Sequence, residues 1–318
     1  MSEINVLSLN VNSDRRIQHG KFANMFPEHS IKNRIFALRD LLFNKEYVLY
    51  LLQEIDDEMA LELLKLFKHY GYTIIFSPYS TSEFAFYLAV AYKNLTPQIS
   101  ASWYTKSGQL TQESNRNKMT KEEKFDRHLG TEFEKCFQII KFNSLTILHT
   151  HFGLQRAHRL AASQILSTYL AADPVMCIGD MNQFDETSKE SKVFMDQINI
   201  FKNNGYTWMG PYPEDGIGST FIAWAYDIAW KVKNINELSR TELIDKAIEC
   251  NPLSTCMDAI FTKGFELSDI KVIGNINGVF YPDNVKDVLA RYAEFYRNGG
   301  SFASDHFGLE FTLPSNTL

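Results

Sequence analysis

Carboxylate, amide and imidazole side chains recur in this sequence at the points where apolar stretches end. The apolar run Val-Met-Cys-Ile at 175–178 is followed by Gly-Asp-Met-Asn, which contributes Asp180 and Asn182. Comparable stretch ends contribute the other members of this set, which are Asn10, Glu54, His151, Asp258, Asp305 and His306. All of these side chains offer oxygen or nitrogen donors. Such donors suit a hard cation such as Mg²⁺, together with groups that hold a phosphate.

The same residue types meet the needs of phosphate-ester hydrolysis. That reaction requires a water molecule in line with the leaving oxygen, relief of the negative charge that develops on phosphorus, and assistance to the leaving group. A cation and fixed hydrogen-bond donors stabilise the charge, and a positioned carboxylate or imidazole transfers the proton. The set therefore fits metal-assisted attack by water, and no residue in it is proposed as a covalent nucleophile.

Each stretch by itself has a structural explanation. Gly-Asp-x-Asn is common in turns, and a carboxylate such as Asp258 inside a strand is often only a hydrogen-bonded structural group. The stretch LHTHF contains His149 and His151. We expect these two side chains on opposite faces of a strand, so that one of them is structural. The joint occurrence of all these stretches, each at a strand end, indicates a site.

The elements that must position these residues alternate between strands and helices. Apolar or alternating stretches predict strands at 4–12, 47–55, 72–79, 84–93, 137–152, 174–180, 255–264 and 305–313. Helical periodicity predicts helices at 31–44, 57–71 and 156–172. The stretch 137–152 should fold as a hairpin near Asn143 and Ser144. This order predicts an α/β fold with mixed sheets.

Three polar segments interrupt the pattern, at 108–128, 234–250 and 281–300. The first is rich in charge and is expected to form a solvated loop, whereas the other two have helical patterns. No stretch rich in Gly, Ser or Pro divides the chain. We therefore expect one domain, residues 1–318, that carries these segments as insertions.

Composition and charge narrow the function classes. The formal net charge is −6 and the sequence pI is about 5.8, which argues against a general polyanion-binding surface. No apolar run reaches the roughly 20 residues that span a bilayer, and residues 1–12 lack the features of a Sec signal. The four cysteines are scattered, so a zinc site is not expected. We expect a cytoplasmic protein, although export by a specialised secretion system is compatible with the same features.

Taken in order, these stretches resemble the endonuclease/exonuclease/phosphatase superfamily, which includes deoxyribonuclease I-like nucleases, inositol polyphosphate 5-phosphatases and neutral sphingomyelinases. The matching blocks are LSLNVN, LLQEID, LHTHF with Arg159 after it, IGDMN, STFIAW, MDAIF and SDHFGL. They extend over nearly the whole chain. The resemblance implies a four-layer αββα sandwich of two mixed β-sheets flanked by helices, as in deoxyribonuclease I.

The resemblance also implies a role for each matching residue. The expected Mg²⁺ ligands, with Mn²⁺ as a substitute ion, are Glu54, Asp305 and Asn10. The expected contacts to phosphate are made by Asn10, Asn182, His306 and Arg159.

The residues that would carry the chemistry follow from the same blocks. Asp180 would position or deprotonate the attacking water, and His306 would donate a hydrogen bond to the phosphate. Asp258 would orient His306, Asn182 would hold a phosphoryl oxygen, and His151 would assist the leaving group.

Departures from family patterns bear on the substrate. Ile178, Gln183, Asp185 and Ala259 stand where inositol 5-phosphatases carry other residues, which disfavours that substrate. Phosphodiester cleavage is therefore preferred to phosphomonoester cleavage, and nucleic acid and phospholipid head groups stay open. The aromatic stretch 221–230 is expected to be a buried strand with a turn; contact with a membrane surface is the alternative. A catalytically silent relative that acts as a binding module is a second class of function.

Overall fold

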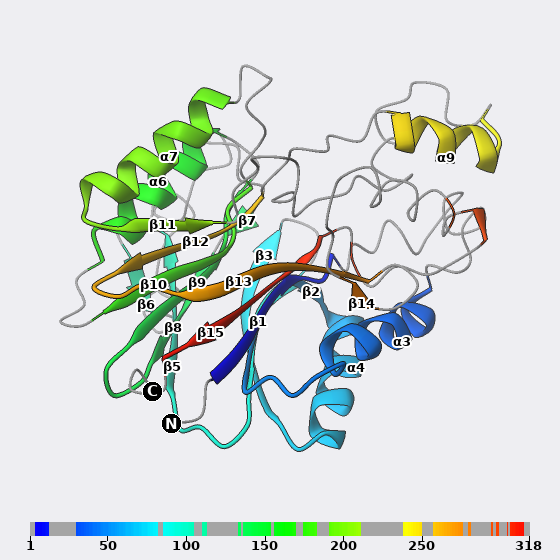
Figure 1. Cartoon of the computed structure of the whole chain (residues 1–318), viewed down its shortest axis with the longest axis horizontal. Coiled ribbons are helices and arrows are strands. Elements are labelled where there is room, and N and C mark those ends of the chain that lie inside the picture. The colour runs from blue at the N-terminus through cyan, green and yellow to red at the C-terminus, as the bar shows by residue number, and fades with distance from the viewer. Residues whose placement is uncertain are drawn as a thin grey trace.

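Figure 1 shows the computed structural model of the chain, whose termini lie near each other at one end of the sheets. The structure describes residues 4–12, 30–81, 85–104, 110–112, 133–134, 136–153, 156–169, 174–182, 191–210, 238–249, 257–275, 279–280, 294, 297–298, 304 and 306–314. Statements about the structure refer to these residues.

The first sheet joins the two ends of the sequence. Within the described residues it has eight strands in the order β14-β13-β15-β1-β2-β4-β3-β7. β1 and β2 are parallel, whereas the other pairs are antiparallel. The strands are β1 (Ile4–Asn10), β2 (Leu49–Asp56), β3 (Thr73–Thr81), β4 (Ala85–Tyr92), β7 (Phe133–Glu134), β13 (Ser268–Asn275), β14 (Val279–Phe280) and β15 (Gly308–Leu313).

The second sheet has seven described strands in the order β11-β12-β10-β9-β8-β5-β6. Its one parallel pair is β9 with β10, next to antiparallel pairs on both sides. The strands are β5 (Gln98–Tyr104), β6 (Leu110–Gln112), β8 (Cys136–Lys141), β9 (Thr146–His151), β10 (Val175–Asp180), β11 (Thr207–Gly210) and β12 (Asp258–Lys263). Both sheets are therefore mixed, as predicted.

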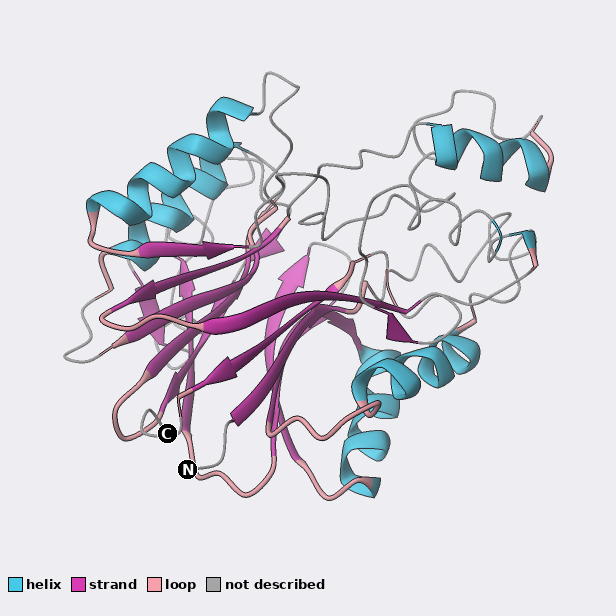
Figure 2. Ribbon diagram, in the orientation of Figure 1, coloured by secondary structure: helices cyan, strands magenta, loops and turns pink. Residues whose placement is uncertain are grey.

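Helices cover the outer faces of the two sheets, as Figure 2 shows. The described helices are α3 (Ile31–Leu42), α4 (Asp57–His69), α6 (Arg156–Ser167), α7 (Ser191–Asn203) and α9 (Arg240–Glu249). α3 and α4 pack on the first sheet through one apolar cluster, and α6 and α7 pack on the second sheet through another. A third cluster fills the space between the sheets. The four layers of the predicted sandwich are thus present.

α4 illustrates how the local sequence specifies an element. Met59, Leu63 and Phe67 recur at a spacing of four residues and form its buried face. The carboxylate of Asp56 accepts a hydrogen bond from the backbone N–H of Met59 at 2.8 Å and so caps the N-terminus. Gly71 follows the helix with a φ of +79°, a conformation that glycine adopts without a steric cost.

Alternation along the central strands divides apolar residues between two layers. On β10, Val175 and Cys177 pack toward α6 and α7, whereas Met176 and Ile178 pack between the sheets. The next residue on the inner face is Asp180. β12 follows the same rule, because its inner-face Ile260 belongs to the cluster between the sheets. On both strands the residue next to the apolar positions of the inner face is a carboxylate at one end of the strand, Asp180 on β10 and Asp258 on β12.

The sequence predictions of strands and helices are largely confirmed, including the hairpin of β8 and β9. The predictions missed β5, β7, β11, β13, β14 and α7, whose sequences were not assigned to any element. The segment 108–128 is not wholly a loop, because Leu110–Gln112 pairs with β5; its other residues lie outside the described ones. The helix expected within 234–250 is α9. Most of 281–300 and all of 221–230 lie outside the described residues.

Among the described helices, none has the length and apolar character needed to cross a membrane.

Candidate active site

The site forms where the two parallel strand pairs end. β1 ends at Asn10, Glu54 lies two residues before the end of β2 at Asp56, and β9 and β10 end at His151 and Asp180. Parallel strands bring their carboxyl ends to one edge, and antiparallel neighbours bring their amino ends to the same edge. Asp258 therefore joins the site at the start of β12, directly opposite Asp180.

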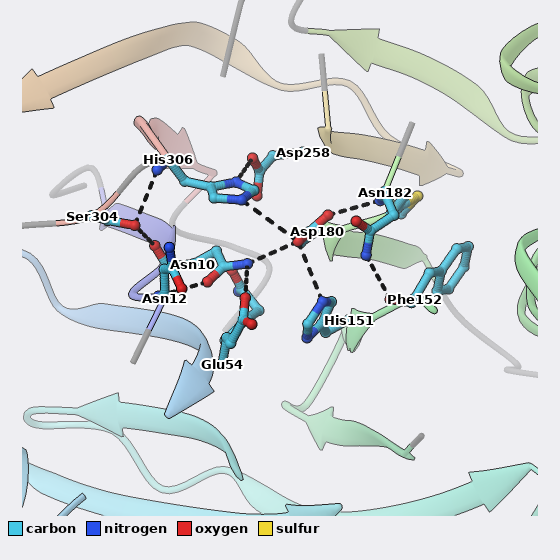
Figure 3. A network of polar contacts seen from close by, with 12 residues as sticks. Asn10, Asn12, Glu54, His151, Phe152, Asp180, Asn182, Asp258, Ser304 and His306 are labelled. Carbon is cyan, nitrogen blue, oxygen red and sulfur yellow. Dashed lines mark hydrogen bonds and ion pairs between the residues drawn. The ribbon is translucent and has the colours of Figure 1, made fainter. Parts of the chain in front are cut away.

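Asn10 links the two sheets through its side-chain amide. Its Nδ2 atom donates to Oε2 of Glu54 at 2.9 Å and to Oδ2 of Asp180 at 2.8 Å, as Figure 3 shows. Its Oδ1 atom accepts the backbone N–H of Asn12 at 2.8 Å. Asn10 is fully buried. It thus contributes N–H groups that hold two carboxylates together, and its oxygen already has a backbone partner.

A break in the ladder of β2 brings Glu54 into the site. The register with β4 shifts between Leu52 and Ile55, and Glu54 has a φ of +58°. Gln53 contacts the inner-face residue His149, and Glu54, the next residue, contacts Asn10. Two successive side chains on the same side are the mark of a β-bulge, which re-aims a side chain at a site. Glu54 is partly exposed, so solvent reaches it.

Asp180 and Asn182 form a turn and part of the site together. Oδ1 of Asp180 accepts the backbone N–H of Asn182 at 2.7 Å, and Asn182 has a φ of +48°. The chain therefore turns here and does not continue β10 as an extended strand. Nδ2 of Asn182 donates to the carbonyl of Phe152 at 2.6 Å, which ties the turn to the end of β9. Asn182 is buried beside Asp180. Its predicted contact with phosphate stays a prediction.

His306 lies between two carboxylates. Its Nδ1 atom is 2.8 Å from Oδ2 of Asp258, and its Nε2 atom is 3.9 Å from Oδ2 of Asp180. Ser304 holds this segment, because its hydroxyl donates to the Asn10 carbonyl at 2.5 Å and accepts the His306 N–H at 3.0 Å. The pairing of Asp258 with His306 is the one predicted.

His149 and His151 lie on the same face of β9, and the expectation of opposite faces was wrong because residues two apart on a strand share a face. The two histidines differ instead in how deeply they are buried. His149 is fully buried between Gln53 and Gln138, and burial lowers its pKa to about 3. It is the structural histidine.

His151 is the last residue of β9, a central strand of the second sheet. Its Nε2 atom lies 3.4 Å from Asp180 and its Nδ1 atom 2.9 Å from the hydroxyl of Tyr79. Tyr79, on β3, was not predicted as a site residue, because it stands within a strand pattern and no motif marks it.

Burial raises the pKa of Asp180 to about 7. His306 opposes this effect, whereas the negative charges of Asp258 and Glu54 add to it. Three carboxylates around one buried point repel one another unless positive charge is present. The electrostatics of the site therefore favour a cation or a proton beside Asp180.

The residues present fit a divalent cation. Glu54, His151 and Asp180 each offer one ligand atom, and these atoms lie within 4.8 Å of one another. Carboxylate oxygens suit Mg²⁺ and Mn²⁺. Among the predicted ligands, the structure places Glu54 here and places Asn10 with its amide nitrogen toward the carboxylates. Asp305 lies outside the described residues.

Arg159 is the one described member of the predicted set that we do not place in this network. It is buried on α6, behind the second sheet, with 1% of its surface exposed. Its predicted contact with phosphate stays a prediction.

Comparisons with known proteins show which fold this is. No family model and no curated protein matches the sequence. Solved structures do match. An endonuclease/exonuclease/phosphatase from Bacteroides vulgatus has a TM-score of 0.57 at 11% identity, over 99% of each chain. A family protein from Leptotrichia buccalis has a TM-score of 0.53 at 15% identity, over 98% of this chain and 99% of its own. The chain has the endonuclease/exonuclease/phosphatase fold.

TDP2 from D. rerio, in complex with a single-strand DNA product, shares this fold with a TM-score of 0.50 at 13% identity, over 98% of this chain and 99% of its own. The endonuclease/exonuclease/phosphatase fold thus extends over the whole set of strand ends described above, including those that carry Asn10, Glu54 and Asp180.

Proposed function

We propose that this protein is a Mg²⁺-dependent phosphodiesterase whose substrate is nucleic acid. The observation that carries the proposal is the position of Asp180. Its carboxylate accepts a hydrogen bond from Asn10 of the first sheet, and it lies beside His151 at the end of β9 and His306 just before β15. A binding module would have no need of a buried carboxylate with a raised pKa among such groups. The DNA product bound to D. rerio TDP2 supports nucleic acid as the first substrate to test.

Glu54 would hold the Mg²⁺ ion beside Asp180, with Asp305 as a further predicted ligand. When bound, the ion would neutralise charge on the phosphate oxygens and on the leaving oxygen. Asn10 would fix the spacing of the two carboxylates, because one amide group donates to both.

The other residues divide the proton transfers. The carboxylate of Asp180 orients the attacking water and takes its proton. His306, which Asp258 fixes through Nδ1, directs its Nε2 atom toward the same point and donates to a phosphoryl oxygen when protonated. His151 assists the leaving oxygen, and Asn182 holds the turn that carries Asp180.

The test is hydrolysis of single-stranded oligonucleotides and bis-p-nitrophenyl phosphate, with Mg²⁺, with Mn²⁺ and with EDTA. We expect activity with either ion and none with EDTA, and we expect Glu54→Gln to lose activity. Glu266→Gln is the control, because Glu266 is exposed and lies in the loop between β12 and β13. Activity that persists in EDTA would overturn the metal requirement. A panel of phospholipids in the same assay decides between the two substrate classes left open by the sequence.

A further inference from the structure

The two histidines of the site differ in what their Nδ1 atoms meet. Nδ1 of His306 lies 2.8 Å from a carboxylate oxygen of Asp258, which only accepts hydrogen bonds when ionised. Nδ1 of His151 lies 2.9 Å from the phenol oxygen of Tyr79, which can donate one. The first contact requires a hydrogen on Nδ1, whereas the second can leave Nδ1 as an acceptor. The two imidazoles can therefore be held in opposite tautomers.

Several features of Tyr79 favour donation to His151. Its side chain is only 2% exposed, and a buried hydroxyl is nearly always hydrogen-bonded. The phenol oxygen also has a hydrogen bond with the backbone of Glu54, whose N–H is the donor that an oxygen can accept. With that N–H directed at the oxygen, the phenol hydrogen points elsewhere, and Nδ1 of His151 lies at hydrogen-bonding distance.

The surroundings of Tyr79 keep its ring in this orientation. The ring packs edge-on against the His151 ring with centroids 5.8 Å apart, and it stacks on Phe86 of the neighbouring strand with centroids 5.9 Å apart. Tyr79 and Phe86 are directly paired residues of β3 and β4. The phenol is thus fixed by the sheet, so the position of its hydroxyl does not depend on a mobile side chain.

We propose that Tyr79 is a positioning residue that fixes His151 as the tautomer with hydrogen on Nε2. In this tautomer the Nε2–H group of His151 faces Oδ2 of Asp180, which lies 3.4 Å from Nε2. An Nε2 atom that carries hydrogen has no lone pair for a cation. His151 therefore acts as a hydrogen-bond donor at the leaving-group side, and the ion beside Asp180 is left to carboxylate ligands such as Glu54. The donor role rests on the proposed function, whereas the tautomer does not.

The tautomer can be measured in the metal-free protein by ¹⁵N NMR of labelled histidines above the imidazole pKa, with His151→Gln to assign the signal. We expect His151 to show a protonated Nε2 and an unprotonated, hydrogen-bonded Nδ1. Tyr79→Phe removes only the hydroxyl and should shift His151 toward a mixture of tautomers. Tyr72→Phe is the matched control, since Tyr72 is also buried but its hydroxyl donates to the Tyr47 carbonyl, at 2.6 Å.

Three results would overturn the proposal: hydrogen on Nδ1 of His151 in the wild-type protein, an unchanged signal in Tyr79→Phe, or loss of the Nε2 hydrogen when Mg²⁺ is added. The wild-type tautomer decides even if Tyr79→Phe does not fold. In the activity assay, Tyr79→Phe should lower kcat by roughly tenfold or more without raising the Mg²⁺ concentration needed for half-maximal rate. If no phosphodiester is cleaved at all, the proposed function fails, and the NMR result still decides the tautomer.

Discussion

Asp180 and Asp258 face each other as directly paired residues of β10 and β12, and both carboxylates are buried. The ring of His306 reaches both, with its Nδ1 atom 2.8 Å from Asp258 and its Nε2 atom 3.9 Å from Asp180. Two carboxylates on either side of one imidazole stabilise positive charge on that ring. This relationship gives the first prediction.

Removing the side chain of Asp180 or of His306 should abolish most of the catalytic activity. We expect Asp180→Ala and His306→Ala each to lower kcat by roughly 10²-fold or more, because each takes away a positioned proton carrier or charge-stabilising donor. Steady-state kinetics on a cleaved phosphodiester, with circular dichroism to confirm folding, measures this. His69→Ala is the control, because His69 is exposed at the end of α4. Folded variants with nearly wild-type rates would rule out these roles.

The raised pKa of Asp180 predicts how stability depends on pH without metal. Its pKa is about 7 in the folded protein and about 3.9 in an unfolded chain. The folded protein therefore binds the proton more tightly, so Asp180 favours folding below about pH 4 and loses that contribution as the pH rises through about 7. The melting temperature of Asp180→Asn, measured relative to that of the wild-type protein, should therefore increase as the pH is raised from about 4 to about 8.

Mg²⁺ should reverse this loss, since a cation replaces the proton between the carboxylates. The melting temperature of the wild-type protein should rise more on adding Mg²⁺ at about pH 8 than at about pH 5. Asp180→Asn should show a smaller rise at the higher pH. A metal-induced shift that is the same at both values would contradict the placement of the ion beside Asp180.

His149 predicts the opposite dependence on pH. Burial lowers its pKa to about 3, whereas an unfolded histidine has a pKa of about 6.5. The unfolded chain binds the proton more tightly, so this contribution to stability is complete above about pH 6.5 and is lost as the pH falls toward about 3. The deficit of His149→Gln relative to wild type should therefore shrink from about pH 7 to about pH 4 in thermal unfolding. A deficit that is constant with pH would mean that His149 is not buried as the neutral form.

Gly179 should tolerate no side chain. A Cβ atom at this position would lie 1.9 Å from the carbonyl oxygen of Thr150 on the neighbouring strand, and its φ is +140°. We expect Gly179→Ala to destabilise the protein by roughly 1–3 kcal/mol or more, because the backbone of β9 or β10 must move. Such a movement would also displace Asp180, so the rate should fall with stability.

The control for this substitution is Gly71→Ala. Gly71 also has a positive φ, +79°, but the nearest atom to an added Cβ lies 3.9 Å away at the flexible end of Lys93. Its cost should be limited to backbone strain, about 1 kcal/mol. Equal losses in denaturant unfolding for the two variants would show that the contact with Thr150 is relieved without cost.

Much of the fold could be predicted from the sequence because its signals are local. The alternation of Met176 and Ile178 with Val175 and Cys177 predicts a strand buried on both faces, and the structure has these pairs in two different apolar layers. The strands β5, β11 and β13 were missed, although Ile99, Ala101 and Trp103 alternate with polar residues on β5. The partners of the strands in each sheet could not be predicted from the sequence. Pairing between residues far apart in sequence leaves no local pattern to read.

The sequence by itself determined the types of the site residues and their places at strand ends. Asn10, Glu54, His151, Asp180, Asp258 and His306 were all identified there, since polar residues after apolar runs are visible in one dimension. Only the tertiary structure decided how they act together. A β-bulge with a positive φ turns Glu54 toward Asn10, and the amide of Asn10 then meets Asp180 across 170 residues of sequence. The tyrosine beside His151 comes from the opposite sheet, and such a contact exists only after the two sheets pack.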